Sequence, residues 1–280
     1  MTAEEDILAT LKADIANNRL TLPTLPEVAL KIRDVVEDED ATIRDVADVI
    51  SSDTALSARL IQVSNSPLYR GNNPVDNIQI AITRLGQMVV RNLATSLVMQ
   101  QMFQATSDVT DKRLRDLWEH NTTVAAISSA LSTLYPKIKA DIAMLAGLVH
   151  DIGALPLLVQ AEEIPELLEN EELLDKVIEE LHTEIGQDIL KAWQFPDEIV
   201  QVAAKHEDLT RVSPGDGPDY VDIVQVANIQ SHMGTSHRLA SMDLSGVPSF
   251  MKLGLDPEVS VIDLEGVAEE MNEIQQTLCA

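Results

Sequence analysis

The residues best suited to chemistry are a histidine and an aspartate side by side in an apolar helical run. His150 and Asp151 interrupt the segment 144–156, whose other residues are almost all apolar. Burying an imidazole and a carboxylate costs several kcal/mol unless each is paired, hydrogen-bonded or bound to a metal. A cation at the rim between them would be reached by both, at about 2.0–2.2 Å. Gly147 and Gly153 bracket the pair and predict that other backbones approach closely there.

An isolated His-Asp pair is more often a surface pair or a satisfied core histidine than a metal site. Here the metal interpretation is favoured by further potential ligands, each of which falls in a largely apolar segment with helical periodicity. These are His120, His182, His206 and Asn228. The remaining histidines, His232 and His237, are expected at the surface or in loops, and Asp151 is the predicted catalytic residue.

Composition and charge limit the classes of partner. The chain has 280 residues, 45% of them hydrophobic and only 3% aromatic, so the core must be built from aliphatic residues and methionine, as is typical of a helical bundle. The formal net charge is −26. Nucleic-acid backbones and anionic membranes both require clustered basic residues, so we expect no direct contact with nucleic acid and none with a membrane surface.

The expected compartment follows from what the sequence lacks. Cys279 is the single cysteine, so no disulfide can form within one chain. Residues 1–14 do not have the pattern of a secretory signal. No uncharged apolar run reaches the roughly 18 residues of a membrane span. We therefore expect a cytoplasmic protein.

Helical periodicity and capping signals predict an all-α chain. One such signal is Thr42 followed three residues later by Asp45, a capping box. The expected helices are 7–20, 26–36, 42–50, 53–64, 78–86, 89–102, 114–134, 142–158, 182–193, 198–206, 220–232 and 267–278. The acidic segment 162–180 is interpreted as a solvated helical face.

The polar segment 107–111 divides the chain into an N-terminal helical subdomain, residues 1–110, and a helical core, residues 111–238. A C-terminal extension, residues 239–280, follows the core.

The order of these motifs resembles the HD superfamily of metal-dependent phosphohydrolases. A histidine is followed by His-Asp, then by His-x-x-x-Gly, then by another histidine, and finally by the polar residue of Val-Gln-Val-Ala-Asn. The upstream motifs at 22–26, 50–56 and 81–86 are similar to the HDOD domain, the HD-related output domain of bacterial signalling proteins. This resemblance runs from about residue 20 to about residue 235.

The resemblance implies an HD-like helical bundle with a set of metal ligands. His120, His150 and Asp151 match three of the four ligands of the first metal, with Asp151 as the bridging carboxylate. Asn228 stands where the superfamily has an aspartate. His182 and His206 match ligands of a second metal. Mixed imidazole and carboxylate ligands suit Fe, Mn, Zn or Ni, so the sequence leaves the identity of the divalent metal open.

Two functional hypotheses remain open. The preferred one is a signalling and regulatory module that binds partner proteins or a small ligand. An amide oxygen at Asn228 brings no charge, which weakens metal retention and favours this hypothesis. The alternative is a metal-dependent phosphohydrolase acting on a nucleotide, a cyclic dinucleotide or another phosphoester.

The alternative requires basic residues near the metal, and the sequence does not place any there. The candidates are Arg70, Arg84, Arg91, Arg113, Lys137, Lys139 and Lys205. A glycine-rich phosphate loop is absent from the sequence, as is a Gly-Tyr-Pro motif after His206. Both absences favour the regulatory hypothesis.

Overall fold

The protein is helical throughout the part of the chain that the computed structural model describes, residues 10–13, 22–38, 40–66, 69, 71, 73–103, 108–235, 237–261 and 267–279. No strand occurs in these ranges, which confirms the predicted all-α class. The N-terminal helices are α2 (Glu27–Glu37), α3 (Ile43–Ser51), α4 (Thr54–Ser64), α5 (Ile78–Leu85) and α6 (Gln87–Met99), followed by the 3-10 turn η1 (Gln100–Phe103). The later helices are α7 (Asp108–Ser132), α8 (Ala140–Val149), α9 (Ala154–Ala161), α10 (Pro165–Glu169), α11 (Glu171–Ala192), α12 (Asp197–Lys205), α13 (Tyr220–Ser231), α14 (Pro248–Leu253) and α15 (Val267–Cys279), with the 3-10 turn η2 (Arg238–Ser241) before α14.

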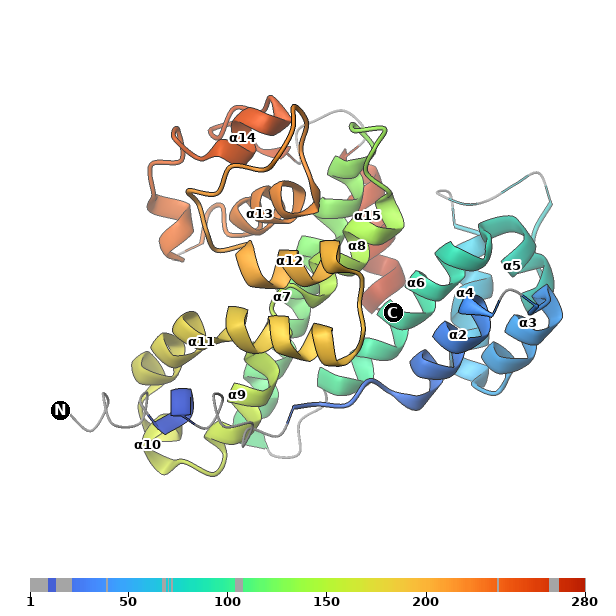
Figure 1. Ribbon diagram of the computed structural model, residues 1–280, viewed down its shortest axis with the longest axis horizontal. Coiled ribbons are helices and arrows are strands. Elements are labelled where there is room, and N and C mark those ends of the chain that lie inside the picture. Colours follow the sequence, from blue (N-terminus) through green and yellow to red (C-terminus); the bar gives the residue numbers. More distant parts are fainter. Residues whose placement is uncertain are drawn as a thin grey trace.

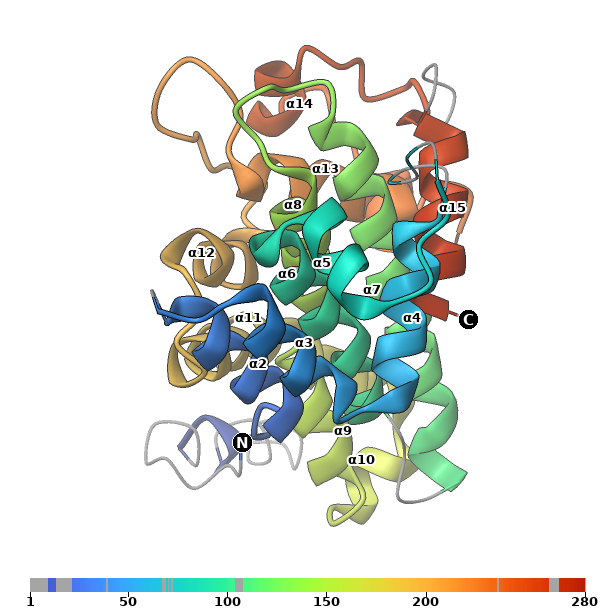
Figure 2. The same cartoon turned by 90° about the vertical axis from the view of Figure 1, so that its right-hand side faces the viewer.

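Helices α7 and α8 form the centre of the molecule. Helix α7 packs against α8, α13 and α15, and α8 also contacts α6, α12 and α13. Helices α2 to α6 pack on one another and join the centre mainly through α6, as the blue and cyan ribbons on the right of Figure 1 show. The perpendicular view in Figure 2 places these N-terminal helices in front of the central pair.

Side-chain caps fix where several helices begin. Thr42 and Asp45 form the predicted capping box at the start of α3, each side chain accepting a backbone N–H of the other residue. Asp53, at the start of α4, accepts from the backbone N–H of Leu56. Each such cap stabilises its helix by about 1 kcal/mol. The predicted helix over 7–20 lies mostly outside the described residues, of which 10–13 are helical.

Three predicted helix bounds differ from the structure. The expected helix over 142–158 is two helices, α8 and α9, separated by a turn at 150–153. The expected helix over 182–193 is the second half of α11, which starts at Glu171 inside the acidic segment. Helix α7 starts at Asp108 rather than 114, so it already includes part of the polar segment proposed as a domain seam.

The turn between α8 and α9 is held by close backbone approach. A Cβ on Gly153 would lie 1.9 Å from the carbonyl oxygen of His182, and one on Gly147 would lie 2.8 Å from the Cα of Ala125. The close approach predicted at these two glycines is confirmed. Helix α11 thus packs directly against the turn. Pro156, which cannot donate the hydrogen bond of a helix interior, also disfavours one continuous helix over this run.

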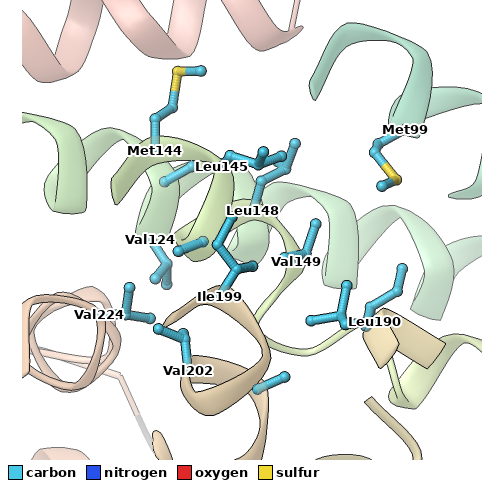
Figure 3. Close-up of a cluster of buried hydrophobic side chains, with 14 of the residues drawn as sticks. Met99, Val124, Met144, Leu145, Leu148, Val149, Leu190, Ile199, Val202 and Val224 are labelled. Atoms are coloured by element: carbon cyan, nitrogen blue, oxygen red, sulfur yellow. The ribbon is translucent and has the colours of Figure 1, made fainter. Parts of the chain in front are cut away.

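A single hydrophobic cluster joins the central helices. Figure 3 shows Leu145 and Leu148 of α8 gathered with Ile199 and Val202 of α12. The segment Ala140–Ala161 is long and apolar enough to cross a membrane by composition alone, but 83% of its most apolar window is buried inside the protein. Packing in this core accounts for its apolar character.

Candidate metal centre

Four histidines from four helices converge on the carboxylate of Asp151. His120 lies in the middle of α7, and His182 lies in the middle of α11. His150 and His206 are the C-terminal caps of α8 and α12, so these two are at helix ends rather than inside helices as expected from the sequence. Asp151 occupies the turn after α8.

The two carboxylate oxygens of Asp151 face different histidines. Oδ2 lies 3.7 Å from Nε2 of His120 and 3.4 Å from Nε2 of His150. Oδ1 lies 3.4 Å from Nε2 of His182 and 3.0 Å from Nε2 of His206. Two three-residue clusters of suitable ligand atoms therefore share one carboxylate.

Backbone carbonyls fix the orientation of the rings. In His150, His182 and His206 the Nδ1 atom lies within hydrogen-bond distance of a carbonyl oxygen one helical turn earlier. The partners are Gly147 at 2.7 Å, Ile178 at 2.7 Å and Val202 at 3.1 Å, respectively. A neutral imidazole that donates through Nδ1 has its lone pair on Nε2. Each of these three rings thus presents an acceptor to the centre.

The centre collects hydrogen-bond acceptors without matching donors. Nε2 of His120 lies 3.3 Å from Nε2 of His150, and the same atoms of His182 and His206 are 3.2 Å apart. Oδ1 of Asp151 is a buried atom, and the nitrogen nearest to it is Nε2 of His206 at 3.0 Å, which donates to it only when that nitrogen carries a proton. Converging buried acceptors repel one another unless a cation lies between them. The side chains present therefore fit a divalent metal.

Protonation states agree with this arrangement. Burial lowers the pKa of His120 to about 4 and that of His150 to about 4, so both rings are neutral near pH 7. Burial alone would raise the pKa of Asp151, but the surrounding histidines, His150 foremost, hold it well below its ordinary value. Burial acts to lower the pKa of His206, yet the adjacent Asp151 carboxylate outweighs it and raises that pKa. The ligands of the first cluster are thus ready for a metal at neutral pH.

Asn228, the sixth predicted ligand, lies beside the centre on α13. Its Oδ1 is buried without a hydrogen-bond partner among the described residues, and its Nδ2 lies 3.5 Å from Oε1 of Glu207. Glu207 Oε1 is in turn 3.9 Å from Nε2 of His206. A carboxylate that the sequence analysis did not single out therefore lies next to the residue that replaces the superfamily's aspartate. Its place directly after His206 was the available signal.

His232 and His237, which were expected at the surface or in loops, form a stack of rings that extends outward from the centre. The ring of His232 stacks on His120 with centroids 4.8 Å apart, and His237 stacks on His232 at 3.7 Å. His237 is exposed, as expected, but it lies at the rim of the centre rather than apart from it. The sequence carried no signal for this stack, because it depends on how the three rings are oriented in space.

Cavities on two sides reach Asp151. One, of about 520 Å³, is lined by His182, Glu207, His237 and Arg238 among others. The other, of about 450 Å³, is lined by Lys112, Arg113 and Ala154 among others. Both are large enough for a small-molecule ligand. Cationic side chains are therefore present on both sides of the carboxylate.

Of the basic residues considered from the sequence, Arg113 is placed at these cavities. Arg113 lies 2.5 Å from Asp175, whereas Arg84 donates to the backbone carbonyls of Ser64 and Asn73. Arg91 lines a different cavity. Arg70 lies outside the described residues. Lys112 and Arg238 line the two cavities at Asp151, although the sequence analysis did not name them.

Known proteins resemble this chain over most of its length. A protein of Shewanella amazonensis, a presumed metal-dependent phosphohydrolase, is 31% identical and superposes with a TM-score of 0.84, covering 99% of this chain and 100% of its own. An HDOD domain protein of unknown function from Geobacter sulfurreducens is 22% identical with a TM-score of 0.67, covering 97% of this chain and 98% of its own.

A curated relative supports the likeness from sequence alone. An uncharacterized protein of Treponema pallidum is 27% identical over 233 residues, which is 78% of this chain. The chain spans only 44% of the length of that relative. The family model of the HDOD domain matches residues 22–209, well over half of the chain. The helical fold and the matched sequence together show that this chain belongs to the HDOD domain family.

Proposed function

We propose that this HDOD protein is a metal-dependent phosphohydrolase, the alternative of the two hypotheses from sequence. The observation that carries the proposal is the convergence of four histidines on the partly buried carboxylate of Asp151, whose side chain is 18% exposed. A resident divalent cation would supply positive charge for a phosphoryl group and make water nucleophilic near neutral pH. His120, His150 and Asp151 would hold one cation, and Asp151 with His182 and His206 a second.

The cationic residues beside the centre are the reason to prefer this alternative. From sequence, the regulatory hypothesis was favoured by Asn228 and by two missing motifs, and no basic residue could be placed near the metal. Arg113 and Lys112 line one cavity at Asp151, and Arg238 lines the other. Each arginine is paired with two carboxylates, so a phosphate would have to displace or share those partners. Guanidinium groups pair well with phosphate oxygens. We therefore propose a phosphorylated small molecule as the substrate, bound across Asp151.

Glu207 offsets the neutral amide at position 228. Its carboxylate contacts Nδ2 of Asn228 and is 2.5 Å from Nη2 of Arg238. A negative charge is thus present one residue after His206, although Arg238 shares it. Arg238, which also lies 2.9 Å from Glu179, orients Glu207 and closes that side of the cavity.

A regulatory module remains the second candidate. Asn228 favours it, because a ligand without charge weakens metal retention. In this case the same centre binds a phosphorylated small molecule as a signal without cleaving it, and partner signalling proteins read the bound state. The two candidates share the ligand chemistry and differ only in turnover.

Chromogenic phosphoesters separate the two candidates. Purified protein is stripped of metal with a chelator and reloaded with Mn²⁺, Fe²⁺, Zn²⁺ or Ni²⁺. It is then mixed with 4-nitrophenyl phosphate or bis(4-nitrophenyl) phosphate. Binding of each ester is measured by calorimetry in parallel with its hydrolysis. Metal-dependent release of 4-nitrophenol that is lost in Asp151→Asn supports the hydrolase. Binding without release supports the regulatory module. If neither ester binds to the metal-loaded protein, the proposed substrate class is wrong.

A matched pair of arginine variants tests the role of the cavity. Arg113→Leu removes a cation that faces Asp151, whereas Arg115→Leu removes one that is 71% exposed and pairs with Asp111. We expect KM to rise about tenfold in Arg113→Leu and to stay unchanged in Arg115→Leu. Equal effects would mean that Arg113 does not bind the substrate.

A further inference from the structure

A separate cavity lies where the N-terminal helices meet the core. It has a volume of about 160 Å³ and is bounded by α2, α6, α8 and the start of α12. None of the residues that line it lines either cavity at Asp151. The cavity is therefore a distinct feature of the fold and not an arm of the metal centre.

The floor of this cavity is apolar. Leu25 and Ala29 contribute from the N-terminal side, and Leu145, Phe195 and Ile199 from the core side. Leu145 and Ile199 belong to the cluster of Figure 3. An apolar cavity of about 150 Å³ accommodates a benzene ring. The floor thus fits one ring or a branched aliphatic group of similar size.

Two arginines line the same cavity. Nη1 of Arg33 donates to the carbonyl oxygen of Trp193 at 2.8 Å, and Nε of Arg91 lies 3.3 Å from Oδ1 of Asn92. Their side chains are 22% and 17% exposed. Both guanidinium groups are thus held by the fold at the cavity wall.

The carboxylates that pair with these arginines are loosely held. Asp34 lies 3.3 Å from Arg33 and is 68% exposed, and Glu37 lies 3.5 Å from Arg91 and is 58% exposed. Ion pairs exposed to solvent in this way contribute little to stability. Of the four groups, Arg33, Arg91 and Glu37 line the cavity. A local excess of positive charge in a chain of net charge −26 favours an incoming anion.

Gln194, at the mouth of the cavity, has strained backbone. Its φ is +57°, the one positive φ outside glycine among the described residues. It follows the C-cap of α11, and Phe195 N–H bonds back to the Leu190 carbonyl oxygen at 3.0 Å. Glycine is usual at this position of a helix end. Strain of this kind gathers at ligand sites, where the side chain is needed.

We propose that this cavity binds a small organic anion, with a ring or branched apolar group on the floor and a carboxylate or phosphate between Arg33 and Arg91. The amide of Gln194 lies at the mouth to bond the same ligand. A bound molecule would contact α8 and α12, the helices that end at His150 and His206. The proposal does not depend on hydrolysis at the metal centre.

Ligand-observed NMR with simple probes tests the proposal. Full-length protein is titrated with benzoate, phenyl phosphate and, as the charge control, benzylammonium. Asp151→Asn is titrated in parallel, so that binding through the metal centre is recognised by its loss in that variant. We expect at least one of the two anions to bind the wild type and Asp151→Asn equally, and benzylammonium not to bind.

Three variants place the binding in the cavity. Arg91→Leu removes a guanidinium, Ala29→Leu fills the floor, and Arg115→Leu is the control for loss of a surface arginine. We expect the affinity for the anion to fall about tenfold or more in the first two and to stay unchanged in the third. Gln194→Gly should raise the melting temperature of the protein and lower its affinity for the anion.

Several results would overturn the proposal. Absence of binding by both anions, equal binding of benzylammonium, or loss of binding of both anions in Asp151→Asn would each do so. Unchanged affinity in both Arg91→Leu and Ala29→Leu would place the anion elsewhere. Circular dichroism of each variant confirms that it is folded. If Arg91→Leu does not fold, Ala29→Leu still tests the proposal, because it fills the cavity and keeps both arginines.

Discussion

Substituting Gly153 by alanine tests how the fold positions the centre. A Cβ there would lie 1.9 Å from the carbonyl oxygen of His182 and 2.5 Å from the backbone nitrogen of Gly186. Both atoms are backbone of α11 and cannot rotate away. Real Cβ contacts essentially never fall below 3.0 Å, so the carbonyl must retreat by at least 1.1 Å.

That displacement has two consequences of predictable size. Overpacking a rigid core costs about 1–3 kcal/mol, and the upper end applies because backbone must move. We therefore expect Gly153→Ala to lose about 3 kcal/mol of unfolding free energy. The distance between Nε2 of His182 and Oδ1 of Asp151, now 3.4 Å, would change by more than the roughly 0.5 Å that a functional site tolerates. Metal affinity should fall at least about tenfold.

Urea denaturation and metal titration measure the two effects, and a graded series provides the controls. A Cβ on Gly147 would lie 2.8 Å from Cα of Ala125, whereas one on Gly217 would meet no atom within 4 Å. Destabilisation should fall in the order Gly153→Ala, Gly147→Ala, Gly217→Ala, the last within about 0.5 kcal/mol of wild type. A Gly153→Ala protein with wild-type stability and metal affinity would refute the packing of the turn against α11.

Three further predictions address charge and capping. Asn228→Asp should tighten divalent-metal binding measured by calorimetry, and unchanged affinity would show that this side chain does not contact the metal. The pKa of His150 is about 4 when folded and about 6.5 when unfolded, so the unfolded chain binds the proton first as pH falls. In chelator-treated protein His150 should therefore account for a loss of about 3 kcal/mol of unfolding free energy between pH 6.5 and 4. His120 and His232, whose pKa values are also lowered to about 4, add to this loss, and His206 opposes it. A His150→Gln variant with the same pH slope in urea denaturation would contradict this. Asp53→Ala should lower the free energy of unfolding by about 1 kcal/mol, because it removes the cap of α4. The metal content should not change, because this cap does not contact the metal centre.

The sequence predicted local features well and three-dimensional ones less well. The capping box at Thr42 and the close approach at Gly153 follow from residue type and neighbouring spacing, and the structure confirms both. The break after Val149 was missed, although Gly153 and Pro156 within the run are residues that interrupt helices. Helical periodicity continues through such a run whether or not the backbone turns.

The candidate centre shows the same division. The residues of the two clusters could be named in advance, because histidines in apolar segments drew attention to them and the resemblance to the HD superfamily implied their grouping as ligands. The resemblance also implied that Asp151 bridges the two clusters, but which histidines face Oδ1 and which face Oδ2 depends on how α7, α8, α11 and α12 cross. Glu207 and the stack from His120 through His232 to His237 depend on side-chain direction alone. Residue order does not encode these contacts.

The metal content of the purified protein, measured beside that of Asp151→Asn, tests the central claim most directly. This variant keeps the shape of the side chain and removes the charge shared by both clusters. Plasma mass spectrometry after reloading with Fe²⁺, Mn²⁺, Zn²⁺ or Ni²⁺ should find one or two equivalents in the wild type and a large loss in Asp151→Asn, with both proteins equally helical. A wild type that retains none of these metals, or a variant that retains as much as the wild type, would contradict a metal centre built on Asp151.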